Sequence, residues 1–291
     1  MTSIHDAHGR RTPFELSLPS REFAVGHFRR IEEDAEEKGV DLRDLGSFVL
    51  LPSTGALVEE LRGGGEDPEL LHQYGALAFH GFHFWRAGEP YFLMETGVAR
   101  YLVEAAPSPT EWEPRAPADA GYLQLPRHLF WSGPEEEGPA EALDGYFWTV
   151  GTGETISFLV AMGMRDDRPG LSVIALPPLP LRDAGAWLGE KARPEGEDFS
   201  TTLPGGSLDR LYSVLNTGEV LKLGARTFWY LDRFPEVVGP EERWAGREAE
   251  SDPRGSSLPF RKIRLAPEPE GGSEGRAEGG SDAGDEREDE A

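Results

Sequence analysis

Residues 67–85, DPELLHQYGALAFHGFHFW, decide how the first half of this chain folds. Asp67 can cap a helix, and Pro68 suits the first helical position. At about 100° per residue, polar side chains including three of the seven histidines gather in one narrow stripe. The apolar side is formed by Leu70, Leu71, Tyr74, Leu77, Ala78, Phe82, Phe84 and Trp85, and the stripe by Glu69, His72, Gln73, His80 and His83. The spacing predicts an amphipathic helix whose polar stripe faces solvent or a partner.

A competing interpretation pairs residues 79–85 with residues 91–95 as a β-hairpin. The segment FHGFHFW also alternates, and its aromatic residues favour strands. In a strand, His80 and His83 would point to opposite faces, and the stripe would not exist. We favour the helix because its period holds over the longer stretch.

The stripe raises the possibility of a metal site. His80 and His83 lie one helical turn apart, and imidazole with carboxylate ligands suits Zn, Fe or Mn. His72 and His80 are eight residues apart, about 12 Å along a helix, so one ion cannot bridge them. A site would therefore combine His80 and His83 with Glu89 or Glu95. A ferritin-like di-iron core is excluded because no second E-x-x-H spacing occurs.

Composition divides the chain into six segments, one of which is a proline-rich connector. These are a mobile N-terminus (1–19), a helical part (20–105), a proline-rich connector (106–120), a β-rich part with C-terminal helices (121–240), a linker (241–265) and a disordered acidic tail (266–291). Within the helical part, Ser20 and Gly39 are predicted to begin and end one helix. Residues 258–265 form either a final edge strand or a short linear motif for a partner.

Alternating apolar residues and turn signals predict successive strands in the β-rich part. The expected strands are Tyr122–Leu125, His128–Trp131, Tyr146–Val150, Thr155–Met164 and Leu171–Leu176. The fold class is therefore α+β, with the N-terminal helices packed on a C-terminal antiparallel meander. Aromatic residues in these strands are interpreted as core rather than as a surface that stacks ligands.

Charge and composition limit the function. The net charge is −24, and the last 26 residues carry 10 acidic and 2 basic side chains. Such a field disfavours nucleic acid and anionic membranes and favours a protein partner, in particular a basic one. No cysteine is present, no apolar run reaches the length of a membrane span, and Arg10-Arg11 is not followed by an apolar export segment. These features predict a cytoplasmic protein.

Recognisable catalytic motifs are absent from the sequence. It contains no G-x-S-x-G elbow between a strand and a helix, no P-loop, no G-x-G-x-x-G and no H-E-x-x-H. The favoured expectation is a non-enzymatic interaction or regulatory protein. The alternative is a metal-dependent enzyme or metal-binding protein that uses His80 and His83.

Overall fold

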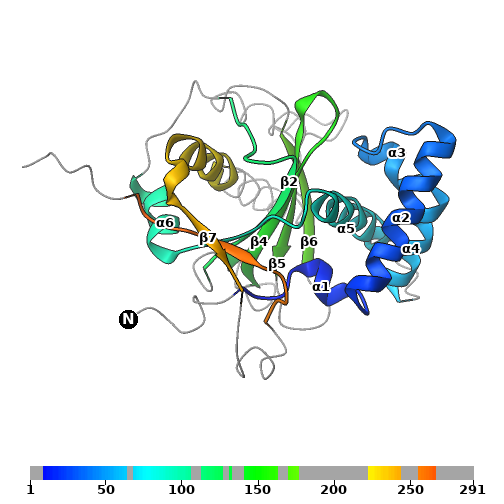
Figure 1. Cartoon of the computed structure of the whole chain (residues 1–291), viewed down its shortest axis with the longest axis horizontal. Helices are drawn as coiled ribbons and strands as arrows, with labels where there is room; N and C mark the ends of the chain where they lie inside the picture. The colour runs from blue at the N-terminus through cyan, green and yellow to red at the C-terminus, as the bar shows by residue number, and fades with distance from the viewer. Residues whose placement is uncertain are drawn as a thin grey trace, which may run out of the picture.

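The computed structural model is a three-layer arrangement with a mixed β-sheet between two sets of helices (Figure 1). It describes residues 9–63, 68–105, 113–126, 131–132, 141–162, 170–176, 222–243 and 255–266. The predicted acidic tail lies outside this description, apart from Ala266. No helix in these parts of the chain is long and apolar enough to cross a membrane.

The sheet has eight strands among the described residues, in the order β6-β5-β4-β2-β1-β8-β7, with β3 paired to β4. The strands are β1 (Tyr91–Met94), β2 (Ala120–Gln124), β3 (Trp131–Ser132), β4 (Glu141–Val150), β5 (Ile156–Met162), β6 (Gly170–Leu176), β7 (Val238–Glu242) and β8 (Phe260–Ile263). Strands β2, β4, β5 and β6 pair antiparallel, as predicted for the β-rich part.

The prediction of a purely antiparallel meander is wrong, because β1 runs parallel to both of its neighbours, β2 and β8. The chain leaves β1 through α6 (Thr96–Arg100) and the π-helical turn η2 (Tyr101–Ala105) before it returns as β2. A crossover through helical structure is what parallel neighbours require. Residues 258–265 do supply a strand, but β8 lies between β1 and β7 and is not at the edge.

Two helices of the helical layer follow the predicted signals, whereas a short one at residues 13–17 lies in the segment predicted to be mobile. The layer contains α1 (Pro13–Ser17), α2 (Arg21–Lys38), α3 (Leu45–Val49), α4 (Pro52–Arg62) and α5 (Pro68–Arg86). Ser20 caps α2 by accepting a hydrogen bond from the backbone N–H of Phe23, and Gly39 ends the helix at φ +63°. Residues 79–85 belong to α5, so the helix is confirmed and the hairpin is wrong.

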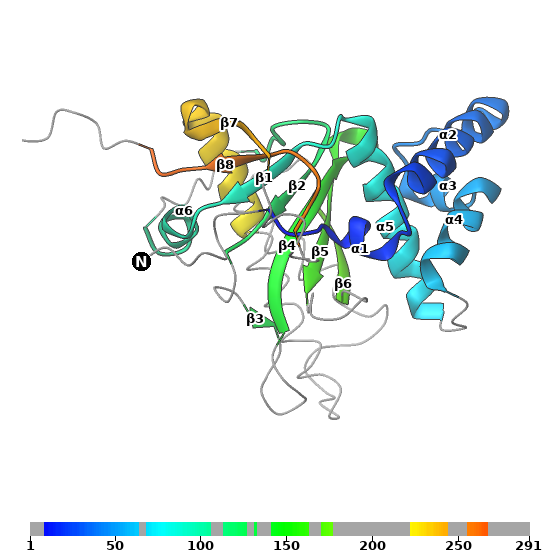
Figure 2. The same ribbon diagram turned by 60° about the horizontal axis from the view of Figure 1, so that its bottom comes forward.

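Helix α5 is buried on both sides, because it lies between the other N-terminal helices and the sheet (Figure 2). Every residue from Tyr74 to Phe84 is buried. Phe82 packs on Phe28 of α2 at 5.6 Å between ring centroids, and Phe84 packs on Phe147 of β4 at 5.4 Å. The prediction of a solvent-facing stripe is therefore wrong for His80 and His83, while His72 is exposed.

A second core fills the opposite face of the sheet. There the helix over residues 222–233 packs with α6 and η2 against the strands. Phe228 stacks on Phe158 of β5 and contacts Trp148 of β4, with centroid distances of 5.7 and 5.4 Å. Since neighbouring residues of a strand point to opposite faces, Phe147 and Trp148 serve different cores. The described aromatic side chains of the sheet are core residues, as predicted.

The N-terminal segment is anchored, although residues 1–19 were expected to be mobile. Arg10 is a buried residue, 7 % exposed, and its guanidinium forms an ion pair of 2.8 Å with Asp144 and donates a hydrogen bond to the Leu125 carbonyl. Gln124 and Tyr91 bond to the Arg10 main chain. The sequence hides this contact because it joins residues more than a hundred positions apart. Residues 1–8 lie outside the described part.

Candidate functional site

His80, the first predicted metal ligand, is enclosed between α5 and the sheet. Its Nδ1 lies 2.9 Å from the hydroxyl of Thr149, and its Nε2 lies 3.1 Å from the hydroxyl of Ser157. Both ring nitrogens are therefore engaged by hydroxyl groups that can donate or accept. Burial lowers the pKa of His80 to about 3, so the ring is neutral at physiological pH.

His83, the second predicted ligand, contacts the loop between α2 and α3. Its Nε2 donates a hydrogen bond of 2.9 Å to the Leu42 carbonyl. Burial lowers the pKa of His83, the bond to Leu42 opposes this effect, and the charges of Arg86 and Arg43 lower it further. The neutral ring therefore keeps its Nε2 proton on a backbone acceptor.

The two carboxylates predicted to complete the metal site lie in other interactions. Glu89 receives two hydrogen bonds from the Arg21 guanidinium, at 2.9 and 3.1 Å. Glu95 lies 3.8 Å from the Arg264 guanidinium. Within the described ranges, no group of three or more histidine, aspartate or glutamate side chains is arranged to hold a metal. The structure does not bring the predicted ligands for Zn, Fe or Mn together.

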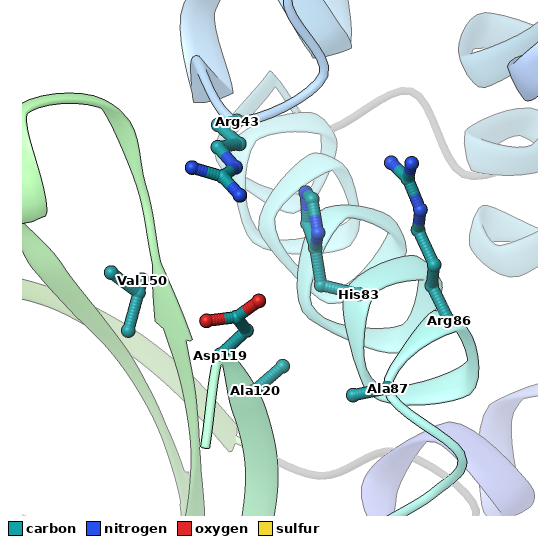
Figure 3. A pocket seen from close by; sticks show the side chains of 7 residues that line it. All are labelled: Arg43, His83, Arg86, Ala87, Asp119, Ala120 and Val150. Carbon is teal, nitrogen blue, oxygen red and sulfur yellow. The ribbon is translucent and has the colours of Figure 1, made fainter. Parts of the chain in front are cut away.

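An open pocket lies beside His83, where the helical layer meets the sheet (Figure 3). Its volume is about 220 Å³. The lining residues are Arg43 from the loop after α2, His83, Arg86 and Ala87 from the end of α5, Asp119 and Ala120 from the start of β2, and Val150 from the end of β4. We call this the junction pocket. Residues from four separate parts of the sequence thus converge on one cavity.

The junction pocket contains unpaired charges. Among the described residues, the side chains of Arg43 and Asp119 form no ion pair, with each other or with any other group, although Figure 3 shows them pointing toward one another. Arg86 lies on the other side of His83, and its Nε is 3.8 Å from Glu32. Since both of those side chains are well exposed, that contact is weak.

Local main-chain contacts hold the backbone that carries these side chains. The Asp41 carboxylate accepts a hydrogen bond of 2.9 Å from the Arg43 N–H, and the adjacent Leu42 carbonyl is held by His83. The Arg43 carbonyl lies so close to Gly151 that a Cβ there would be 3.1 Å away. On the sheet side, the N–H of Val150 donates 2.7 Å to the Asp119 carbonyl. The walls of the pocket are therefore tied to both layers.

A second cavity, of about 200 Å³, lies between α1, the start of α2 and Leu258. Most of its charged side chains already have partners. Glu15 accepts hydrogen bonds from the Thr12 N–H and the Ser256 hydroxyl, and Arg21 is paired with Glu89. This arrangement holds the two terminal segments together and offers fewer free groups than the junction pocket.

The buried polar network around Arg10 has no access to a ligand. The Tyr122 hydroxyl donates 2.7 Å to the second carboxylate oxygen of Asp144, and Tyr91 donates to Gln124. Burial raises the pKa of both tyrosines well above their usual value, so the phenols stay protonated. The network anchors the N-terminal segment to the sheet.

Sequence reasoning identified only one residue of the junction pocket, His83. No motif marks Arg43, Arg86 or Asp119, because each is a charged residue in or beside a turn, a common pattern in an acidic chain. Only the contact between the end of α5 and the sheet brings them together. Comparison of the chain with protein-family models, with curated proteins and with solved structures finds no match, so the geometry of the pocket carries the functional argument.

Proposed function

We propose that this protein is a non-enzymatic interaction or regulatory protein that recognises an anionic group in the junction pocket. The observation that carries the proposal is the convergence of Arg43, His83 and Arg86 on one open cavity. Arginine presents a planar fork of donors that matches carboxylate and other oxoanions. Arg43 forms no ion pair among the described residues, and the 3.8 Å contact of Arg86 with Glu32 is long and exposed, so both guanidinium groups can bind a ligand.

The lining also supports binding rather than catalysis. The seven described lining residues include no serine, threonine, cysteine, lysine or tyrosine that could act as a nucleophile. The Leu42 carbonyl holds the Nε2 proton of His83, which leaves Nδ1 of the neutral ring to accept a hydrogen bond. What remains is a set of charges suited to recognition.

A regulatory role follows from the position of the pocket. A ligand held there would touch the loop after α2, the end of α5 and the edges of β2 and β4 at once. A group that binds only the assembled form stabilises it in proportion to its concentration and affinity. Ligand binding would therefore strengthen the contact between the helical layer and the sheet.

The test is calorimetric titration of the full chain with acetate and with phosphate. We expect saturable binding that Arg43→Ala and Arg86→Ala weaken about tenfold or more, which corresponds to about 1.4 kcal/mol. Arg29→Ala is the matched control, because it removes the same charge from an exposed position on α2 outside the pocket. Absence of binding, or equal binding by all four proteins, would overturn the proposal.

A further inference from the structure

Asp119 gives the junction pocket a second, opposite charge that a simple anion leaves unused. On the basis of the function proposed above, we propose that the junction pocket binds a small zwitterion, namely an α-amino acid. The carboxylate of the ligand pairs with Arg43, and Arg86 adds positive potential. The ammonium group of the ligand pairs with Asp119.

Two opposite charges, those of Arg43 and Asp119, face each other in the junction pocket. Arg43 and Asp119 point toward one another across the pocket yet form no ion pair (Figure 3). Each main chain has its own hydrogen bond, from the Arg43 N–H to the Asp41 carboxylate and from the Val150 N–H to the Asp119 carbonyl. A ligand with a carboxylate at one end and an ammonium at the other satisfies both groups without moving either backbone.

Asp119 disfavours ligands that carry only negative charge. A phosphate or sulfate placed against Arg43 would bring its own negative charge close to this carboxylate, and like charges repel. A simple amine would meet two guanidinium groups in the same space. Only a molecule with both charges finds each of them complemented, so the pocket selects by attraction and by repulsion together.

The size of the junction pocket and its apolar walls indicate a small ligand. A volume of about 220 Å³ is smaller than the roughly 300–1,000 Å³ typical of sites for drug-sized ligands, so the occupant is small. Ala87, Ala120 and Val150 complete the lining with apolar surface. These walls suit a short aliphatic side chain, and L-alanine is therefore the appropriate probe.

The experiment compares three probes that differ by one charged group. L-Alanine carries both charges, propionate lacks the ammonium, and ethylamine lacks the carboxylate. In titrations of the full chain, we expect L-alanine to bind at least about tenfold more tightly than either analogue. Asp119→Asn should remove the preference for L-alanine over propionate while propionate still binds.

Further variants separate this inference from the proposed function. Arg43→Gln should weaken both L-alanine and propionate, and Arg29→Gln should change neither. If propionate or phosphate binds as tightly as L-alanine, and Asp119→Asn leaves the ratio unchanged, the zwitterion is wrong although anion recognition stands. If none of L-alanine, propionate, acetate and phosphate binds, the proposed function itself fails and the inference with it.

Discussion

At the scale of single residues, His80 shows how burial changes the meaning of a polar side chain. On a helical wheel it belongs to a hydrophilic stripe, yet in the fold it is 0 % exposed. Thr149 and Ser157 supply hydroxyl partners that make this burial tolerable, because a neutral imidazole needs one donor and one acceptor. Its role is to join α5 to β4 and β5.

This environment predicts acid sensitivity of the folded state. The pKa of His80 is about 3 in the fold, below the ordinary 6.5 expected for the unfolded chain, so the unfolded form binds the proton first. The free energy of unfolding should therefore fall as the pH drops from about 6.5 toward 3, by up to about 1.4 kcal/mol per pH unit from this group. Urea unfolding at several pH values measures the slope.

The His80→Gln variant should show a smaller loss of stability with acid than the natural protein. His72→Gln is the control, since His72 is exposed on the same helix and its replacement should leave the slope unchanged. Equal slopes for His80→Gln and the natural protein would show that this histidine does not govern acid stability.

At the scale of elements, α5 organises the molecule because it packs on α1, α2, α3 and α4 and on the sheet. Close approach by α1 requires a glycine. A Cβ at Gly81 would lie 2.4 Å from the ring of Phe14, well inside contact distance. The glycine is thus needed for space, although glycine within a helix costs about 1 kcal/mol relative to alanine.

We expect Gly81→Ala to destabilise the protein by about 1–3 kcal/mol, because the ring of Phe14 must shift in a packed core. Gly26→Ala is the matched control in α2, where a Cβ meets nothing within 4 Å. That change should stabilise the protein by about 0.5–1 kcal/mol through helix propensity. Thermal unfolding of both variants decides the matter, and a Gly81→Ala protein as stable as the natural one would contradict this packing.

At the scale of the whole molecule, the two ends of the described chain are joined across the sheet. Arg10 forms an isolated β-bridge with Gly255, and Glu15 bonds to Ser256. Strand β8 then enters the sheet between β1 and β7. The Ala266 N–H, the last described contact, donates to the Tyr230 hydroxyl.

These contacts predict where the chain can be shortened. Truncation after Ala266 removes a segment with no large apolar side chain, so the melting temperature should stay within a few degrees of that of the full chain. Truncation after Ser257 removes β8 and should prevent cooperative folding. Calorimetry of both proteins tests this, and a large fall in melting temperature after the shorter deletion would contradict it.

Local signals made much of the fold predictable. Ser20 and Gly39 mark the ends of α2 through hydrogen bonds to residues three or four positions away. The strands from β2 to β6 follow each other along the chain, so alternation and turns were enough to propose their antiparallel pairing. The parallel strand β1 was missed as part of this sheet because its partners, β2 and β8, lie far along the sequence.

The sequence by itself therefore determined α2 with its caps, α5, the antiparallel pairing of β2, β4, β5 and β6, and the acidic charge of the chain. Tertiary structure alone decided that His80 and His83 face inward, that β8 is an internal strand, and that Arg43, Arg86 and Asp119 line one pocket. The reason is sequence separation. The partners of His80 lie 69 and 77 residues away and that of His83 lies 41 residues away, far beyond the reach of any helical or strand period.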